Sequence, residues 1–389
     1  MRSVFPGDSH PESRIVGISS AVVDRARARG GLDGIGIYTE ALLAHVERPG
    51  LTAKRVDTPH VSGCGLTLPH HDAIRLPIPL PIAIALGAVA HVRTPGCGPL
   101  ERAVDLYHST DYMVPRLRRT PVVATVYDAI PIVHPQWANQ RLRAFKNWLL
   151  AQSVRNADVV IAISEAGRNE VVSHYGIRAE RTRVIPLGID GAWFDAVDER
   201  AMQSTMLRRK LERGYFLFVG TLQPRKNVEA LLDAYEALPQ AIRQERQLVI
   251  VGKYGWNADA LRRRLEEARP QNRCVWLDYV PRDELYQLYA GAGAFVFPSL
   301  AEGFGLPLLE ALAKGLPIIA SDLPVLRELG GDLVAYVDAR DTKALTDAMA
   351  CFAQTSVDGS ERAKRIAHAT PYSWHACAEH TVAVYRELW

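Results

Sequence analysis

The chain has 389 residues, of which 48% are hydrophobic and 23% charged, and its formal net charge is +3. This length suffices for two domains that each have a full core, and the composition is that of an ordinary soluble globular protein. The five cysteines are scattered and lack CxxC spacing, which argues against a zinc site or a disulfide framework. The sequence also lacks a basic stripe interleaved with aromatic residues, the pattern that would indicate a nucleic-acid partner. We therefore expect a cytoplasmic protein.

The first predicted strand, residues 14–19, is followed by the glycine-rich segment 30–38 and a helical pattern over 39–45. A glycine-rich loop that leads into a helix can cradle a diphosphate, because its backbone N–H groups point toward the ligand. The spacing of a Rossmann dinucleotide motif is absent, so this segment alone does not specify the ligand.

The apolar run 76–90 is too short to span a bilayer and has prolines at its start, which predicts a buried or interfacial helix. Basic residues cluster in the same half of the chain, where they could contact anionic lipid or phosphate or simply form a solvated basic face. The clusters are Arg25, Arg27 and Arg29; Arg116, Arg118 and Arg119; and Arg141, Arg143 and Lys146.

Two further predicted strands, 105–110 and 121–127, end in polar residues, at the edge where parallel α/β sheets bind their ligands. Asp128 follows the second of these strands, where it can orient a substrate hydroxyl or cap the next turn. A helix is predicted over 141–154, and a buried strand over 157–164 ends at Ser164, a residue typical of a helix N-cap. We place the hinge between the two halves at residues 192–203.

The second half opens with a strand at 215–219, and Arg225 and Lys226 stand directly before a predicted helix, 228–238. Two cations at a helix N-terminus are unfavourable unless an anion lies there, which predicts a bound phosphate; the alternative is a solvated turn. Strands at 247–251 and 275–280 and a helix at 283–290 continue the alternation. Strands that alternate with helices in both halves predict two doubly wound α/β domains.

Residues 298–322 carry the most specific pattern in the chain. A short apolar strand, 294–297, ends at a loop in which Gly303 and Gly305 flank Phe304 and follow Glu302. Pro307 suits the first turn of a helix that contains Glu310, and a second strand follows. We therefore expect the two carboxylates to face one crevice, although an ordinary βαβ unit with a surface glutamate is the alternative.

The run E-G-F-G-L-P-x-x-E resembles the paired-glutamate motif of the retaining GT-B glycosyltransferases of family 4. The resemblance implies two Rossmann-like domains that face each other across a cleft, with Glu302 at the transferred sugar and Glu310 at the ribose of the donor. It also implies metal-independent transfer without a cofactor. The donor-binding residues implied by it are Gly34, Gly36, Gly220, Arg225, Lys226, Val280, Gly303, Phe304, Gly305, Leu306 and Glu310.

One position departs from the family pattern. Many relatives have a histidine at the end of the strand 121–127, where this chain has Tyr127. A tyrosine hydroxyl can hydrogen-bond a sugar but is a poor base near neutral pH, and His108 or His134 could supply an imidazole instead, although a structural role is the favoured reading for both. The catalytic candidates are Glu302, Tyr127 and Asp128.

The expected domains are an acceptor-side domain, 1–195, a donor-binding domain, 196–370, and a final helix, 371–389, that crosses back to the first domain with Trp374 and Trp389 in the core. The resemblance implies hexose transfer from GDP-mannose or a GDP-deoxyhexose to a glycan or lipid-linked acceptor. The basic clusters and the apolar run 76–90, by contrast, are the basis for expecting peripheral contact with an anionic membrane. A UDP-sugar-dependent transferase, a nucleotide-sugar epimerase and a non-catalytic nucleotide-sugar-binding protein are the alternatives.

Overall fold

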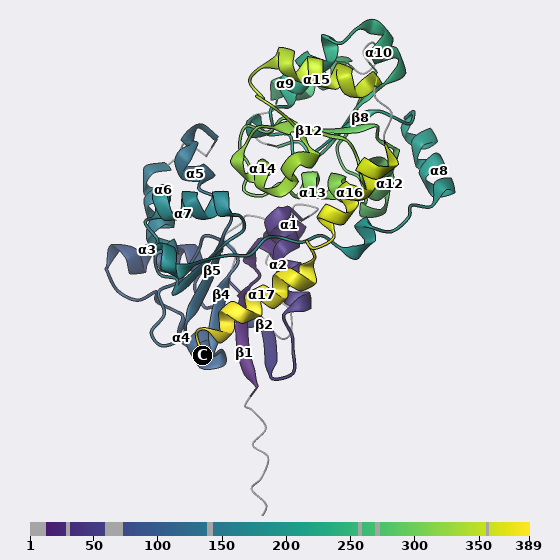
Figure 1. Ribbon diagram of the computed structural model, residues 1–389. Helices are drawn as coiled ribbons and strands as arrows, with labels where there is room; N and C mark the ends of the chain where they lie inside the picture. The colour runs from purple at the N-terminus through teal and green to yellow at the C-terminus, as the bar shows by residue number, and fades with distance from the viewer. Residues whose placement is uncertain are drawn as a thin grey trace, which may run out of the picture.

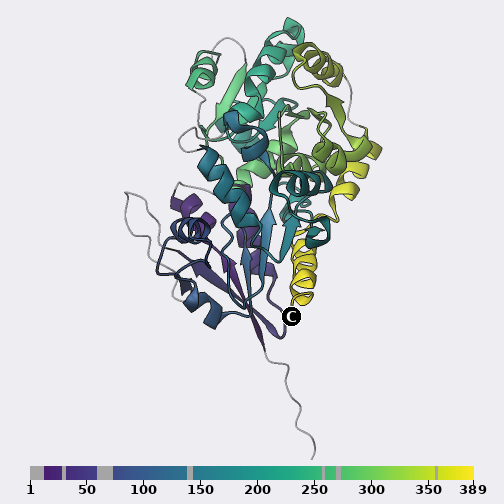
Figure 2. The same cartoon turned by 90° about the vertical axis from the view of Figure 1, so that its left-hand side faces the viewer.

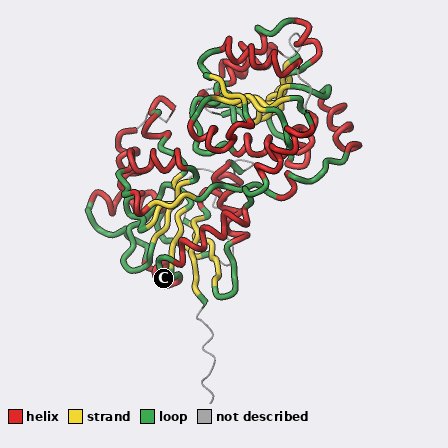
Figure 3. Tube along the Cα trace, in the orientation of Figure 1, coloured by secondary structure: helices red, strands yellow, loops and turns green. Residues whose placement is uncertain are grey.

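The computed structural model describes residues 13–28, 32–58, 73–137, 143–255, 259–268, 273–354 and 358–389. Their strands form two separate parallel sheets, one in each half of the chain, and helices cover the faces of both (Figure 1, Figure 3). This arrangement confirms the predicted fold of two Rossmann-like units. The N-terminal residues 1–12, Arg29 to Gly31 and Arg141 lie outside the described residues, as do the side chains of Arg25 and Arg143.

Within these residues the first sheet has seven strands in the order β3-β2-β1-β4-β5-β6-β7. They are β1 (Arg14–Ser19), β2 (Leu51–Asp57), β3 (Ile74–Arg75), β4 (Leu106–Ser109), β5 (Val122–Val126), β6 (Val159–Ala162) and β7 (Thr182–Val184). The helices of this half are α1 (Ala21–Ala28), α2 (Gly34–His45), α3 (Leu80–Val89), α4 (Gly98–Ala103), α5 (Ile130–Val133), α6 (Arg143–Val154) and α7 (Glu165–Tyr175). Every residue of β4, β5 and β6 is buried, which explains their nearly continuous apolar sequences.

The second sheet has six described strands in the order β10-β9-β8-β11-β12-β13. They are β8 (Phe216–Val219), β9 (Leu248–Val251), β10 (Cys274–Leu277), β11 (Ala294–Phe297), β12 (Ile318–Ser321) and β13 (Ala335–Val337). The helices that follow β7 are α8 (Glu199–Arg209), α9 (Val228–Glu236), α10 (Gln240–Glu245), α11 (Asp259–Ala268), α12 (Arg282–Gly291), α13 (Leu306–Ala313), α14 (Pro324–Gly330), α15 (Thr342–Gln354), α16 (Gly359–Ala369) and α17 (Trp374–Arg386).

The last helix, α17, packs on the first unit although the preceding helices belong to the second (Figure 1, Figure 2). Tyr385 binds Nδ1 of His108 on β4 through its hydroxyl at 2.6 Å, and Trp374 is buried against Tyr38 of α2. Trp389, by contrast, is 38% exposed, so its prediction as a core residue was wrong. The helix ends at Arg386, and Trp389 lies beyond its last turn.

The chain passes between the two units twice, and the two passages lie side by side. Ile189, which follows β7, pairs with Ser373, which precedes α17, in an isolated parallel bridge. The backbone of Gly188 lies so close to this second passage that an added Cβ would be 2.2 Å from the carbonyl carbon of Ser373. The predicted domain boundaries at 195 and 370 stay predictions.

Helix α2 begins earlier than the sequence pattern indicated. Asp33 caps it by accepting a hydrogen bond from the N–H of Gly36 at 2.9 Å, and the helix starts at Gly34 instead of Thr39. Gly34 and Gly36 therefore lie in the first turn of a helix and not in an open loop.

Candidate active site

The two units meet where the carboxyl ends of their central strands face each other. A Cβ added to Gly303, in the loop after β11, would lie 2.7 Å from the carbonyl oxygen of Tyr127 and 3.1 Å from Oδ2 of Asp128. On the same side, a Cβ added to Gly34 would lie 3.8 Å from Leu306. At Gly303 the absence of a side chain permits the close approach of backbone from the opposite unit, whereas Gly34 lies at an ordinary contact distance from the Leu306 side chain. The two units thus face each other at these strand ends, where parallel α/β sheets bind their ligands.

A buried ion-pair cluster lies on the second-unit side of this cleft. Lys226 Nζ donates to Oε1 of Glu302 at 2.5 Å, and Arg225 donates to Oε2 of the same carboxylate at 3.1 Å and to the carbonyl oxygen of Ala301 at 3.0 Å. The side chains of Lys226 and Glu302 are only 8% and 7% exposed, and that of Arg225 is 25% exposed. The structure thus joins the predicted phosphate-binding cations to the predicted catalytic glutamate.

Burial and pairing act on the pKa values of this cluster in opposite directions. Burial alone would raise the pKa of Glu302, but Lys226 and Arg225 outweigh it and lower that pKa to about 2. Burial lowers the pKa of Lys226 to about 8, because desolvation of the ammonium exceeds the attraction of Glu302. The cluster therefore carries two cations and one anion near neutral pH, a net positive charge that an anionic ligand can neutralise.

The pKa of Lys226 leads to a pH-dependent prediction. Lys226 loses its proton as pH rises through about 8, whereas Arg225 stays charged, so the affinity for a nucleoside diphosphate should fall above pH 8 by up to about tenfold per pH unit. The phosphates themselves are fully ionised in that range, since their last pKa is about 6. Calorimetric titrations with GDP from pH 7 to 9.5 measure this, with Lys226→Arg as the variant that should remove the decline. An equal decline in both proteins would contradict the assignment.

Asp128 faces this cluster from the first unit. Its Oδ1 accepts hydrogen bonds from the hydroxyl of Tyr112 at 3.1 Å and the N–H of Ile130 at 3.0 Å. Burial raises the pKa of Asp128 to about 6, although the Ile130 N–H and Arg225 lower it, so the carboxylate is mainly ionised at pH 7. Asp128 thus caps its own turn and leaves Oδ2 directed toward Gly303, so both roles considered from the sequence are compatible with its position.

Tyr127 is buried, and its hydroxyl donates to the carbonyl oxygen of Thr110 at 2.7 Å. The hydroxyl proton is therefore engaged inside the first unit, and burial raises the pKa of this phenol well above its usual value. Its main-chain carbonyl, not its hydroxyl, is the part of Tyr127 that lies against Gly303. A catalytic role for the residue stays a prediction, and this geometry leaves only acceptor capacity on the hydroxyl oxygen.

Neither histidine near the site supplies a free imidazole of ordinary basicity. His108 is fully buried between the hydroxyls of Tyr385 and Thr125, and burial lowers its pKa to about 3, which supports a structural role. His134 stacks on Trp137 with a ring-centroid distance of 4.4 Å, and burial lowers its pKa. The charge of Arg340, from the second unit, also lowers that pKa.

Glu310 and Glu302 contact different residues. Its Oε2 accepts a hydrogen bond from the hydroxyl of Tyr289 at 2.8 Å, and burial raises its pKa to about 7. Arg282, which pairs with Asp190 after β7, lies close enough to lower that pKa in part. The two glutamates thus have separate partners, with Glu302 beside the cations and Glu310 beside the first passage between the units.

The remaining predicted donor residues lie on loops and helix starts around the cleft. Gly220 ends β8, and an added Cβ there would lie 3.6 Å from Cε of Lys226. Gly305 has a φ of +106° as the N-cap of α13, a conformation that favours glycine, and Leu306 begins the helix. Phe304 is buried near Tyr372, and Val280 is partly buried in the loop between β10 and α12.

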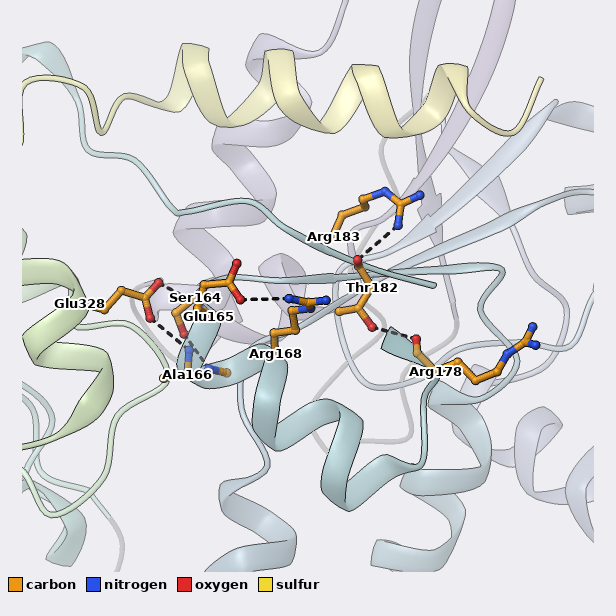
Figure 4. Close-up of polar contacts among 9 residues, drawn as sticks. Ser164, Glu165, Ala166, Arg168, Arg178, Thr182, Arg183 and Glu328 are labelled. Atoms are coloured by element: carbon orange, nitrogen blue, oxygen red, sulfur yellow. Dashed lines mark hydrogen bonds and ion pairs between the residues drawn. The ribbon is translucent and has the colours of Figure 1, made fainter. Parts of the chain in front are cut away.

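Two residues that link the units were not expected to do so from the sequence. Ser164 caps α7 as expected, but its hydroxyl also donates to the carbonyl oxygen of Gly303 at 3.3 Å. Glu328 of α14 accepts two hydrogen bonds from the first turn of α7 (Figure 4).

Two Rossmann-like units that face each other, with a buried cluster of cations where their strand ends meet, form the GT-B arrangement. Residues 202–370 match the family described as Glycosyl transferases group 1, and residues 51–193 match Glycosyltransferase Family 4. The chain belongs to this family of glycosyltransferases.

The relatives agree with this assignment. The chain is 31% identical to the O-antigen chain mannosyltransferase B of Escherichia coli over 288 residues, which cover 73% of this chain and 74% of that protein. It is also 31% identical to the serotype-specific mannosyltransferase WbdA of Escherichia coli, over 61% of this chain but only 31% of that longer protein.

Solved structures share the fold at low sequence identity. Sucrose-phosphate synthase from Thermosynechococcus elongatus has a TM-score of 0.72 at 21% identity and covers 96% of this chain and 99% of its own. Anabaena HepE in complex with UDP-glucose has a TM-score of 0.69 at 15% identity, over 96% of this chain and all of that one. Across the described residues, no helix is long and apolar enough to cross a membrane.

Proposed function

We propose that this glycosyltransferase moves a hexose from a nucleoside-diphosphate sugar to a hydroxyl of a glycan or lipid-linked acceptor in polysaccharide or lipopolysaccharide biosynthesis, with retention of configuration, without a metal ion and without a cofactor. The observation that carries the proposal is the buried Arg225–Lys226–Glu302 cluster that faces Asp128 across the cleft. GDP-mannose or a GDP-deoxyhexose is the favoured donor, because two of the relatives are named as O-antigen or serotype-specific mannosyltransferases.

The residues divide the work between the two units. Arg225 and Lys226 neutralise the charge that develops on the leaving diphosphate, as preorganised groups in a site of low water content. Glu302 holds both cations in place and lies where a sugar hydroxyl can reach it, while Glu310 binds the ribose. Asp128 accepts a hydrogen bond from the acceptor hydroxyl and orients it toward the anomeric carbon.

The chemical step requires no covalent bond to the protein. The acceptor oxygen bonds to the anomeric carbon on the face from which the diphosphate leaves, and the bond from that carbon to the phosphate oxygen breaks. The hydroxyl proton passes to the departing phosphate oxygen, so the atoms and charges balance. The protein positions the reactants and stabilises the charge, which accounts for most of such catalysis.

Nucleotide binding by the Arg225→Ala variant tests this assignment. A charge-assisted hydrogen bond to phosphate contributes about 1.5–3 kcal/mol, so the variant should bind a nucleoside diphosphate roughly ten- to hundredfold more weakly. Calorimetry with GDP and UDP measures the loss and gives the base preference. Arg243→Ala is the control, because Arg243 of α10 donates to the carbonyl oxygen of Leu238 and has no part in the proposed phosphate site. Unchanged affinity in Arg225→Ala would contradict the proposal.

The alternatives predict other outcomes. A stronger binding of UDP than GDP would favour a UDP-sugar donor, in keeping with the UDP-glucose complex of HepE. Conversion of free nucleotide sugar without acceptor would indicate an epimerase. Tight donor binding without transfer to any acceptor fraction would indicate a non-catalytic binding protein.

We also propose that the first unit docks on an anionic membrane at the cytoplasmic face. Helix α3 exposes Ile82, Leu86 and Val89, which share one face, and α6, which packs on α3, exposes Phe145 and Trp148. Figure 2 looks onto this side of the molecule, which is the left-hand side in Figure 1. Lys146 is exposed on α6, and Arg93, Arg116, Arg118 and Arg119 are exposed on nearby loops of the same unit. Apolar side chains within a basic surface are typical of interfacial binding.

Sedimentation with lipid vesicles tests the membrane contact. Each basic side chain near an anionic surface contributes about 1 kcal/mol, so vesicles that contain phosphatidylglycerol should sediment the protein at low salt, and high salt should release it. Leu86→Glu should weaken sedimentation, whereas Leu207→Glu, on an exposed residue of α8 in the other unit, should not. No sedimentation of the wild type at low salt would refute this contact.

A further inference from the structure

The start of helix α7, in the first unit, is held by two groups of the second unit. The Glu328 carboxylate of α14 accepts hydrogen bonds from the N–H groups of Glu165 and Ala166 at 2.8 and 3.0 Å, one with each oxygen (Figure 4). Next to them, the hydroxyl of Ser164 donates to the carbonyl oxygen of Gly303 at 3.3 Å. One helix start therefore contacts both α14 and the loop that carries Glu302.

The first N–H groups of a helix have no partner within the helix and carry partial positive charge. In α7 the first two, of Glu165 and Ala166, bind Glu328, and the third, of Gly167, donates to Ser164 Oγ at 2.9 Å. A carboxylate is the favoured acceptor at this position, because it satisfies two donors and complements the helix dipole. If the two units separated, both N–H groups and the carboxylate could only bind water.

This contact lies beside the reacting groups. Strand β6 leads into Ser164 and α7, and it pairs with β5, which leads into Asp128. Holding α7 against α14 and Gly303 therefore sets how closely the carboxylate of Asp128 approaches the Glu302 loop. A displacement of about 1 Å at such a site can reduce a rate about a hundredfold.

We propose that Glu328 is a positioning residue for glycosyl transfer, which acts by clamping the start of α7 onto the second unit and so brings Asp128 to the Arg225–Lys226–Glu302 cluster. Its effect on the rate rests on the proposed function, but the clamp itself does not. Glu328 touches neither Glu302 nor the cations in the described structure, so its loss leaves the phosphate-binding groups in place.

Steady-state kinetics separate positioning from binding. Glu328→Ala should lower kcat about ten- to hundredfold, while GDP affinity and the thermal midpoint of the second unit stay close to those of the wild type. Glu328→Gln keeps one acceptor oxygen, so its kcat should lie between those of the wild type and Glu328→Ala. Glu361→Gln is the matched control, because Glu361 of α16 pairs with Lys364 on its own helix.

The helix side of the contact gives an independent variant. Proline is well tolerated as the first residue of a helix, so Glu165→Pro should remove one N–H donor without disturbing α7. Glu165→Ala retains that N–H and serves as the reference for the loss of the side chain. Glu165→Pro should lower kcat relative to Glu165→Ala, and this loss should shrink when Glu328 is already alanine, because the two changes remove the same hydrogen bond.

Amide hydrogen exchange tests the hydrogen bonds between Glu328 and the start of α7 without any substrate. The amides of Glu165 and Ala166 should exchange several-fold faster in Glu328→Ala than in the wild type, with the amides of α17 unchanged as an internal reference. Unchanged exchange at both amides would overturn the clamp, and a wild-type kcat in Glu328→Ala would overturn its positioning role. No transfer by the wild type from any donor, with clear GDP binding and the exchange effect intact, would overturn the proposed function and with it the positioning role, but not the contact.

Discussion

Glu302→Gln should lower kcat by at least about a hundredfold and also destabilise the protein. The carboxylate is the partner of both Lys226 and Arg225, and its side chain is nearly inaccessible. An uncharged amide would leave two cations close together in a buried site, and the removal of one member of a buried ion pair costs about 3–5 kcal/mol. Both cations should then move away from the position where they stabilise the leaving diphosphate.

Glu310→Gln provides the comparison. Burial raises the pKa of Glu310 to about 7, so this carboxyl is already half protonated near neutral pH, and it accepts a hydrogen bond from the neutral hydroxyl of Tyr289. We expect a small loss of stability and mainly a higher donor KM. Steady-state kinetics and thermal unfolding of both variants distinguish the two roles. An equal rise in KM, with kcat unchanged in both, would refute separate functions for the two glutamates.

Gly303→Ala should have a similarly large effect by a steric route. The added methyl group would lie 2.7 Å from the carbonyl oxygen of Tyr127, and this neighbour is backbone that cannot rotate away. The loop after β11 and the end of β5 must then separate, so kcat should fall roughly a hundredfold, whereas GDP should still bind Arg225 and Lys226.

The control for this variant is another glycine with free space around it. A Cβ added to Gly359, at the start of α16, meets no atom within 4 Å, so Gly359→Ala should keep the wild-type rate and thermal midpoint. Calorimetry with GDP, together with the transfer rate, decides the outcome. A wild-type rate in Gly303→Ala would show that the two units need not approach as closely as the structure indicates.

Much of the fold could be predicted from the sequence, since strands buried on both faces are continuous apolar runs. The segments AFVF of β11 and VVIA of β6 are examples, and the helix that starts near Pro307 and ends before Gly315 followed from its boundary residues. The start of α2 was harder to place, because the capping role of Asp33 depends on its backbone conformation, and the glycines that follow favour no single state.

The site was predictable in its residue types but not in its contacts. The local sequence around Arg225 and Lys226 predicted an anion-binding position. Their pairing with Glu302 could not be predicted locally, because it joins segments 76 residues or more apart. The sequence left open whether the hydroxyl of Tyr127 reaches the sugar, and only the fold shows that it donates a hydrogen bond to the carbonyl oxygen of Thr110 on a neighbouring strand end. Glu328 gave no local signal at all, since its partners lie 162 and 163 residues away, in the other unit.

The return of α17 to the first unit has a consequence for how the protein forms during synthesis. The second unit leaves the ribosome before the helix that completes the first, and domains in general fold as they emerge. Until Tyr385 arrives, the imidazole of His108 lacks one of its two buried partners, and the surface of α2 that receives Trp374 is exposed to water. The first sheet therefore reaches its final form only after α17 has been synthesised, which leaves the half that was translated first exposed to aggregation and proteolysis until then.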